Sequence, residues 1–347
     1  MHVLPDYRRI VLLTDGRLGV FSSKTASSLL RYRGDDVVAI IDSASAGRPL
    51  RDSIPWAPER PIVTDIAATL DYEPEALFIG VAPSGGALTA EMGAHVRDAL
   101  RAGIDVVSGL HTRVAVDAEC RKLAEAGGAR ILDLREPPAE QIVATGRACE
   151  TRCRRILTVG TDGNVGKMVA ALELTRTARK RGLDARFLAT GQTGIMIEGR
   201  GIAIDAVISD FAAGAVEEMV VASGECDVCV IEGQGSLGHP GFSGVTLALL
   251  HGSCPDAMIL VHHAGRTHYK NLSRRPLPSL SALRSAYENV AGLLHPSRIV
   301  AVALNTHGLD RAAAARCARD LERELGIPVA DVWRADCDVL LDAAIAT

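Results

Sequence analysis

The sequence predicts an α/β protein with two parallel-sheet domains, one over residues 1–150 and one over residues 151–347. Two observations support this fold class. Short apolar runs alternate with helical patterns along both halves of the chain, which is typical of parallel strands connected by helices. Near the middle of the chain, a glycine-rich turn that ends in Lys167 joins an apolar run to a helical pattern, which is typical of a phosphate-binding loop.

Composition narrows the class of protein. A chain of 347 residues exceeds what one hydrophobic core usually serves, and 48% hydrophobic with 23% charged residues is ordinary for a globular protein. The net charge is −4 and the lysines and arginines are scattered, which argues against a nucleic-acid or membrane partner. The N-terminus reads as a strand rather than a signal peptide, and no apolar run approaches the ~20 residues that span a bilayer. We therefore expect a cytoplasmic protein.

The first half is predicted to be Rossmann-like. Its strand-like runs are RIVLLT, DVVAIID, ALFIGVA and DVVSG, and its helical patterns are KTASSLLRY and AEMGAHVRDALRAG. The first turn, residues 14–19, lacks the full G-x-G-x-x-G pattern, although Asp42 ends the second run, where an acid often binds a ribose. His111 follows the last of these runs at the carboxyl edge of the sheet, where ligands bind, so it is a candidate substrate ligand.

The second half is predicted to be P-loop NTPase-like and to begin with the phosphate loop. Glycines allow the backbone N–H groups of such a loop to converge on an anion, and the following helix and lysine add positive charge. Five residues separate Gly160 from Gly166, against four in the strict Walker pattern, and Met168 replaces the hydroxyl residue that binds magnesium. The predicted phosphate-binding residues are Gly160, Thr161, Asp162, Gly163, Asn164, Val165, Gly166, Lys167 and Met168.

Further strands and helices are expected beyond this loop. The strand-like runs are DARFLAT, DVCVIEG, DAMILVHH and RIVAVALN, and helices are predicted at 211–223, 241–251, 279–293 and 310–325. About twenty small, polar and charged residues follow DARFLAT, where a simple connection would be shorter, and such long segments are usually functional. The candidate substrate-binding residues of this segment are Gln192, Arg200, Asp205 and Asp210.

Candidate catalytic and substrate-binding residues lie at or just after the ends of the next two predicted strands. Glu232 ends the run CDVCVIE, where an acid holds magnesium in nucleotide enzymes or serves as a general base in a metal-free site. The run HHAGRTHYK at residues 262–270 carries His263 and His268, candidates for acid–base work, with Arg266 and Lys270 as candidate ligands of an acidic substrate.

No metal site is predicted. The spacing of the three histidines in 262–268 is not a known ligand spacing. Cys226 and Cys229 lie three positions apart in a strand-like run, so we expect their side chains on opposite faces of the sheet. Cys149 and Cys153 are spaced to share a helix face without a further ligand pair. All four are therefore expected to be structural thiols.

The loop GTDGNVGK resembles the phosphate loop of dethiobiotin synthetase and its relatives. Glu232 is similar to the acidic strand end of those proteins, and Asn305 to their adenine-binding asparagine. A wider resemblance covers essentially the whole chain. Seven phrases in the same order resemble a two-domain P-loop family that includes the D-glutamate N-acetyltransferases: IGVAPSGG, VVSGLH, VGTDGNVGKM, FLATGQTGI, VIEGQGSL, SGVTLALLHGS and GRTH.

This resemblance implies transfer of an acetyl group from acetyl-CoA to the amino group of D-glutamate. A threonine often follows GKM in the family, whereas Val169 stands there in this chain, so a magnesium-binding hydroxyl is missing. Coenzyme A carries phosphates and adenine that such a loop can hold without magnesium. The loop would therefore bind coenzyme A, with Asn305 at the adenine, and the partner would be a small-molecule amino-acid substrate. We expect a homo-oligomer.

Two alternatives stay open at this stage. The first is an ATP-dependent ligase or kinase of the dethiobiotin synthetase type, which would use ATP with magnesium. The second is a non-catalytic nucleotide-binding protein, which the altered phosphate loop favours.

Overall fold

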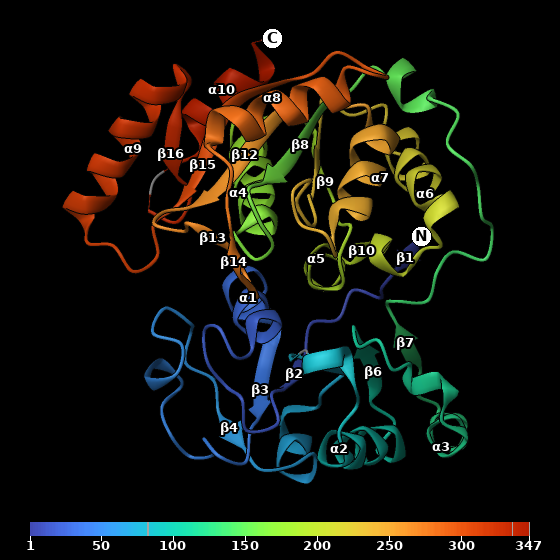
Figure 1. Ribbon diagram of the computed structural model, residues 1–347. Coiled ribbons are helices and arrows are strands. Elements are labelled where there is room, and N and C mark those ends of the chain that lie inside the picture. Colours follow the sequence, from blue (N-terminus) through green and yellow to red (C-terminus); the bar gives the residue numbers. More distant parts are fainter. Residues whose placement is uncertain (82, 335, 347) are drawn as a thin grey trace. The chain divides into compact units, whose positions relative to one another are not determined.

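The computed structural model describes residues 1–81, 83–334 and 336–346 (Figure 1). Ala82, which belongs to the run ALFIGVA, lies outside the described residues. The chain divides into two compact units. The N-terminal unit holds His2–Glu136 and Gln192–Ala203, and the C-terminal unit holds most of the remainder. The change of unit after Glu136 precedes the boundary expected near residue 150.

The N-terminal unit contains a six-stranded parallel sheet. In order across the sheet, its strands are β4 (Ile62–Val63), β3 (Val37–Ile41), β2 (Ile10–Leu13), β5 (Ala76–Ile79), β6 (Asp105–Ser108) and β7 (Ile131–Asp133). The helices of this unit are α1 (Lys24–Tyr32), α2 (Ala90–Arg101), α3 (Ala118–Gly127) and α5 (Gln192–Glu198). The short strands β1 (His2–Val3) and β10 (Arg200–Gly201) pair in antiparallel fashion.

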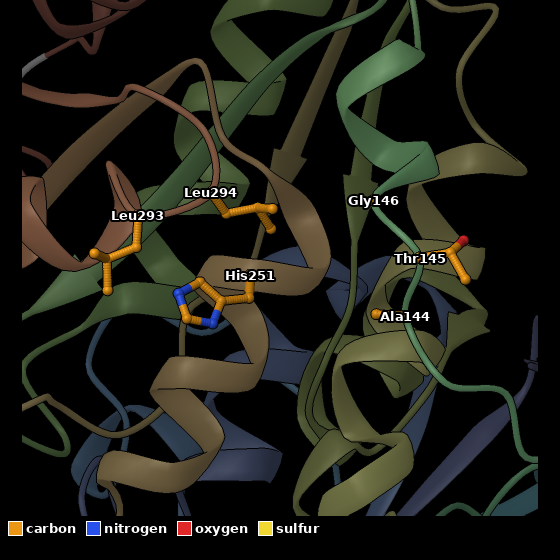
Figure 2. A pocket seen from close by; sticks show the side chains of 6 residues that line it. All are labelled: Ala144, Thr145, Gly146, His251, Leu293 and Leu294. Carbon is orange, nitrogen blue, oxygen red and sulfur yellow. The ribbon is translucent and has the colours of Figure 1, made fainter.

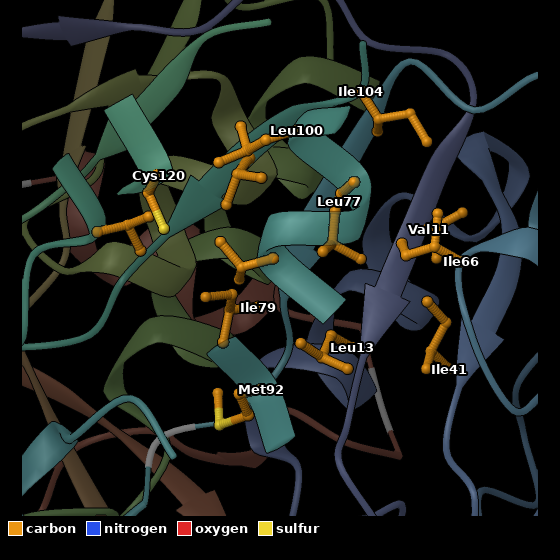
Figure 3. Close-up of a cluster of buried hydrophobic side chains, with 14 of the residues drawn as sticks. Val11, Leu13, Ile41, Ile66, Leu77, Ile79, Met92, Leu100, Ile104 and Cys120 are labelled. Atoms are coloured by element: carbon orange, nitrogen blue, oxygen red, sulfur yellow. The ribbon is translucent and has the colours of Figure 1, made fainter. Parts of the chain in front are cut away.

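Apolar side chains of these strands and helices form one core cluster, part of which Figure 3 shows. Leu13 and Ile79 of neighbouring strands pack in the cluster with Met92 and Leu100 of α2, and all four are at most 1% exposed. Near-continuous apolar runs are expected of strands that are covered on both faces. The strands and helices of this unit also alternate along the chain, as predicted for the first half.

The C-terminal unit contains a second six-stranded parallel sheet. In order across the sheet, its strands are β16 (Val329–Asp331), β15 (Arg298–Asn305), β12 (Ala257–His263), β8 (Arg154–Gly160), β11 (Val228–Ile231) and β9 (Ala185–Leu188). The helices are α4 (Lys167–Lys180), α6 (Ser209–Val221), α7 (Ser243–Ser253), α8 (Leu280–Ala291), α9 (Arg311–Leu325) and α10 (Asp338–Ile345). A hairpin of β13 (His268–Tyr269) and β14 (Leu272–Pro276) follows β12.

Helices pack on this sheet in groups. Helix α4 contacts β8, β9 and β11 and also packs against α10, while α7 contacts β8 and lies against α6 and α8 (Figure 1).

Local sequence sets several helix ends. Asp310 accepts the N–H of Ala313 at 2.7 Å at the start of α9, and Gly326 ends that helix with a φ of 65°. Among the described residues, no helix combines the length and apolar character needed to cross a bilayer.

Because all strands of the second sheet are parallel, the ends of β8, β11, β12 and β15 meet at one edge. This carboxyl edge carries the phosphate loop, and it is where ligands bind in open parallel sheets.

Candidate active site

The phosphate loop joins β8 to α4 at residues 161–166. Gly166 has a φ of 112°, a conformation that favours glycine, and Asn164 has a φ of 54°. Gly166 occupies the N-cap of α4, so the first backbone N–H groups of the helix have no side-chain cap there. These N–H groups and the positive end of the helix dipole can therefore bind an anion.

Lys167 is buried beneath this loop. Its side-chain Nζ donates to the carbonyl oxygen of Asp162 at 2.8 Å. Burial lowers the pKa of Lys167 to about 8, while the charges of Asp162 and Glu232 oppose that shift. A Cβ atom at Gly160 would lie 2.8 Å from Nζ, so glycine leaves the space that the lysine occupies. The ammonium group thus stays close to the site expected for phosphate.

Glu232 directly follows β11 and is also buried. Its Oε2 accepts the backbone N–H groups of Thr190 at 3.0 Å and Gly191 at 3.2 Å. Burial is the main cause that raises the pKa of Glu232 to about 7, against the lowering effect of the two hydrogen bonds and of Lys167. A carboxyl group with this pKa exchanges protons near neutral pH, as a general base must.

Very close packing joins β8 to the segment after Glu232. The N–H of Gly233 donates to Thr158 Oγ1 at 2.9 Å, and a Cβ atom at Gly233 would lie 1.6 Å from the Thr158 carbonyl oxygen. Tyr287 of α8 is fully buried, donates its hydroxyl to the Gly160 carbonyl at 2.7 Å and accepts the N–H of Leu237 at 3.2 Å. The phosphate loop and residues 233–237 are therefore held in one hydrogen-bonded arrangement.

Asp162 connects the loop to the segment after β12. Its Oδ2 accepts from Arg266 Nη1 at 3.0 Å and from the backbone N–H of Lys270 at 2.7 Å, and the same Nη1 donates to the Gly163 carbonyl at 2.8 Å. Arg266 was predicted as a ligand of substrate carboxylates. In the structure its guanidinium hydrogen-bonds to Asp162 and Gly163 of the phosphate loop. Lys270 contacts Asp162 through its backbone N–H.

The histidines after β12 divide between two environments. His262 is buried, and its Nδ1 lies 3.1 Å from Thr161 Oγ1 in the loop. Burial lowers the pKa of His262 to about 4, aided by His263 and Arg266. His263 Nδ1 contacts the Ala264 carbonyl at 2.9 Å, and the exposed His268 contacts Thr267 Oγ1 at 3.0 Å. The histidine that touches the phosphate loop is thus one that was not among the predicted catalytic residues.

Asn305 ends β15 beside the loop. Its Nδ2 donates to the Val165 carbonyl at 3.1 Å, and its Oδ1 accepts the N–H of His307 at 3.0 Å. A Cβ atom at Gly166 would lie 3.6 Å from Asn305 Nδ2 and 4.0 Å from Trp333 Nε1. Asn305 and Trp333 therefore both lie near Gly166, at the end of the phosphate loop.

The predicted substrate ligands fall in both compact units. In the C-terminal unit, Asp205 and Asp210 are exposed, and the charge of Asp205 acts on Glu232. In the N-terminal unit, Gln192 Oε1 accepts from Arg135 Nη2 at 3.0 Å, Arg200 lies in β10, and His111 is exposed next to Gly86.

The segment after Gly191 also has more regular structure than a loop. Helix α5 and strand β10 lie in it, and Gln192–Ala203 belongs to the N-terminal unit.

The prediction that Cys226 and Cys229 lie in one strand with their side chains on opposite faces was wrong. Cys226 precedes β11 instead of lying in it, so strand alternation does not separate the two side chains. Their sulfur atoms are 3.3 Å apart. Cys149 lies in a short 3₁₀ helix at Arg147–Glu150, and Cys153 lies beyond its end, so these two do not share a helix face.

A separate cavity of about 480 Å³ lies in the C-terminal unit (Figure 2). Its lining residues are Ala144, Thr145, Gly146, His251, Leu293 and Leu294. His251 lies in the last turn of α7, and the two leucines lie just after the end of α8; both helices return the chain to the amino edge of the sheet. This cavity contains none of the residues around the phosphate loop.

Comparison with known proteins places the chain in a family. Residues 142–341 match the model described as a P-loop domain of unknown function, DUF1611_C, and residues 43–137 match its Rossmann-like partner, DUF1611_N. The chain belongs to the DUF1611 family. Both the predicted family relationship and the predicted fold class, a Rossmann-like domain followed by a P-loop domain, are confirmed.

The chain is similar to two named proteins and to a solved structure. The chain is 40% identical to a D-glutamate N-acetyltransferase of Tritonibacter scottomollicae over 78% of this chain and 81% of that protein. It is 37% identical to a D-glutamate N-acetyltransferase of a Pseudoalteromonas species over 76% of this chain and 79% of that protein. A crystal structure of a DUF1611 protein from Anabaena variabilis matches with a TM-score of 0.93 and 44% identity, covering 98% of this chain and all of that one.

Proposed function

We propose that this protein transfers an acetyl group from acetyl-CoA to the amino group of an acidic amino acid, D-glutamate. The observation that carries the proposal is a buried acid and a buried lysine, Glu232 and Lys167, at the sheet edge that carries the phosphate loop, in a chain similar to two D-glutamate N-acetyltransferases. The pair supplies a base and a cation at one sheet edge. An N-acetyltransferase needs both, because the donor is anionic and only the free amine attacks.

In this proposal the phosphate loop would hold the anionic part of coenzyme A. A Cβ atom at Gly163 would meet nothing within 4 Å, so the loop is open at this position. The first N–H groups of α4 and Lys167 would hold the pyrophosphate. Asn305 would contact the adenine with its second amide hydrogen, and the ring of Trp333 is a candidate to stack on the base.

Glu232 is the proposed general base. When bound, acetyl-CoA supplies the acetyl thioester that the substrate amine attacks. Glu232 would first take a proton from the substrate ammonium, a role that contributes about 10²–10⁴-fold in known enzymes. His262 is neutral near pH 7, because its pKa is about 4. His263 and His268 remain candidate bases, and Lys270, in the same compact unit as Glu232, is a candidate ligand of a substrate carboxylate.

The chemistry of the loop favours coenzyme A over ATP with magnesium. A P-loop enzyme that hydrolyses ATP uses a hydroxyl residue after the lysine to bind magnesium. Met168 and Val169 have no hydroxyl. Phosphate binding through backbone N–H groups and Lys167 does not need the metal.

A thiol-release assay tests the proposal. The full chain is incubated with acetyl-CoA and a panel of D- and L-amino acids, and in parallel with ATP, magnesium and the same panel, with ADP as readout. We expect thiol release with D-glutamate and no amino-acid-dependent ADP. ADP formation without thiol release would replace the proposal by the ligase or kinase function. Nucleotide binding without turnover in either arm would favour a non-catalytic protein.

Replacing Glu232 by glutamine tests the base. The glutamine Oε1 can keep both hydrogen bonds from Thr190 and Gly191, so the fold should persist. We expect kcat to fall by about 10²-fold or more while coenzyme A affinity stays within about twofold. In the wild type, kcat/KM should rise with pH around a midpoint near 7, which follows the pKa of Glu232.

Glu225→Gln is the matched control. This exposed glutamate lies before β11, at the other end of the strand from Glu232, and should tolerate the same change. Wild-type turnover in Glu232→Gln would remove Glu232 from the mechanism.

A further inference from the structure

We propose that Cys153, Cys226 and Cys229 bind one thiophilic d¹⁰ metal cation, Cu(I) or Zn(II). The three side chains are 2%, 4% and 0% exposed, in that order. Their sulfur atoms all lie within 4.8 Å of one another. The group lies at the amino ends of β8 and β11, whereas the phosphate loop and Glu232 lie at the carboxyl ends of the same strands. It is therefore a second site, separate from the proposed acetyl transfer.

The sulfur positions fit one bound cation. A metal–sulfur bond is about 2.3 Å, so three sulfurs around one ion in a plane lie about 4 Å from one another. The sulfurs of Cys226 and Cys229 are 3.3 Å apart, and all three sulfurs lie within 4.8 Å of one another. Small side-chain rotations would equalise the three separations without a change of the backbone.

The backbone already holds the three cysteines in place. Cys153 immediately precedes β8, and Cys229 lies within β11, which pairs with β8. The turn that carries Cys226 is closed by its N–H, which donates to the Ser223 carbonyl at 3.2 Å. The same carbonyl accepts from Cys229 Sγ at 3.7 Å. Such preorganisation is required for tight metal binding.

A guanidinium near the sulfurs can support their negative charge. On binding, three S–H protons leave for solvent and three metal–sulfur bonds form, with no change of oxidation state. The Thr151 hydroxyl lies 3.6 Å from Cys153 Sγ and accepts from buried Arg155 at 2.8 Å. A guanidinium, itself paired with Asp256, thus lies one hydrogen bond from the cluster.

The number of ligands favours Cu(I) over Zn(II). Among the residues that the structure describes, the group contains three cysteines and no further His, Asp or Glu. Structural zinc takes four ligands, while soft thiolates select Cu(I), which accepts three.

Titration of the reduced, metal-free full chain tests the site. One arm adds Cu(I) against a competing chelator and follows copper–thiolate absorption, and the other adds Zn(II) against a zinc indicator. We expect one ion per chain in at least one arm, a raised Tm in that arm, and loss of both effects in Cys226→Ser. Cys149→Ser, in which the cluster is intact, should bind like the wild type.

Two results would overturn the proposal. One is the absence of stoichiometric binding in both arms, and the other is wild-type binding by Cys226→Ser. If Cys226→Ser does not fold, X-ray absorption of the wild type loaded with the ion that binds decides. Three sulfur neighbours support the proposal, and fewer than three reject it.

Discussion

Burial sets the charge of His262 beside the phosphate loop. Its pKa is lowered to about 4, below the ordinary value of 6.5, so the unfolded chain binds the proton more readily than the folded chain. Stability therefore falls as pH decreases from 6.5 to 4, by at most about 3 kcal/mol from this group. Glu232 acts in the opposite direction, because its raised pKa of about 7 makes the folded chain bind a proton between pH 4.5 and 7.

His262→Asn should reduce the acid sensitivity of folding. The asparagine side chain can hydrogen-bond to the Thr161 hydroxyl in place of Nδ1, but it does not titrate. Urea unfolding at pH 7 and pH 5 is the measurement. We expect the wild type to lose more stability than the variant between the two pH values. Equal losses would mean that His262 does not carry the acid sensitivity.

Single residues differ in how far the sequence reveals them. Lys167 and Glu232 were predicted because a motif and a strand end fix their positions. His263 was named as a candidate and His262 was not, although His262 is the one that contacts the loop. Neighbouring residues of a strand point to opposite faces, and the sequence does not say which face meets the loop. Tyr287 reaches Gly160 from a distant helix, and no local pattern marks such a contact.

At the scale of elements, the close contact of β8 with Gly233 is the least tolerant of change. An alanine there would place Cβ 1.6 Å from the Thr158 carbonyl oxygen, so the two segments must separate. We expect Gly233→Ala to lose at least about 3 kcal/mol of stability or not to fold.

Gly244→Ala is the matched control. This glycine lies in α7, and a Cβ atom there would meet nothing within 4 Å. It should gain about 0.5–1 kcal/mol, because alanine favours the helix. Thermal unfolding of both variants is the measurement. Similar Tm values for Gly233→Ala and Gly244→Ala would contradict the expectation and show that β8 can move at Thr158 to accommodate the added Cβ atom.

Elements with strong patterns were predicted closely. The helix predicted at 310–325 is α9 (Arg311–Leu325), and that at 279–293 is α8 (Leu280–Ala291). Helix α5 was missed because its sequence, QTGIMIE, is short and contains a glycine. The three-residue strand β16 was missed because so short a run carries too little periodicity.

At the scale of the molecule, the division into units was the hardest feature to predict. Gln192–Ala203 follows Gly191 of the C-terminal unit but belongs to the N-terminal one. Its place depends on contacts with residues distant in sequence, such as the hydrogen bond between Thr193 and Thr25 at 2.8 Å and the pairing of β10 with β1. These contacts join residues that are far apart in the sequence, so local patterns along the chain do not predict them.

The proposed binding of coenzyme A predicts which segments of the chain a ligand should protect from amide hydrogen exchange. The adenine and phosphates of coenzyme A are assigned to the C-terminal unit alone, at residues 160–167 and Asn305. The nucleotide fragment 3′-phospho-ADP, which lacks the pantetheine arm, should therefore slow amide hydrogen exchange in these segments without magnesium, because bound N–H groups exchange less often. Exchange in β2 and β5 should stay unchanged.

Exchange measured with and without a chelator distinguishes the alternatives. If protection of the loop disappears when magnesium is removed, the site uses a metal despite Met168 and Val169, and the ATP-dependent function regains support. If protection appears in β2 and β5 but not in the loop, the nucleotide binds to the N-terminal unit and the assignment of the loop is wrong. Protection of the loop that is independent of magnesium is the expected result, because backbone N–H groups and Lys167 bind phosphate without a metal.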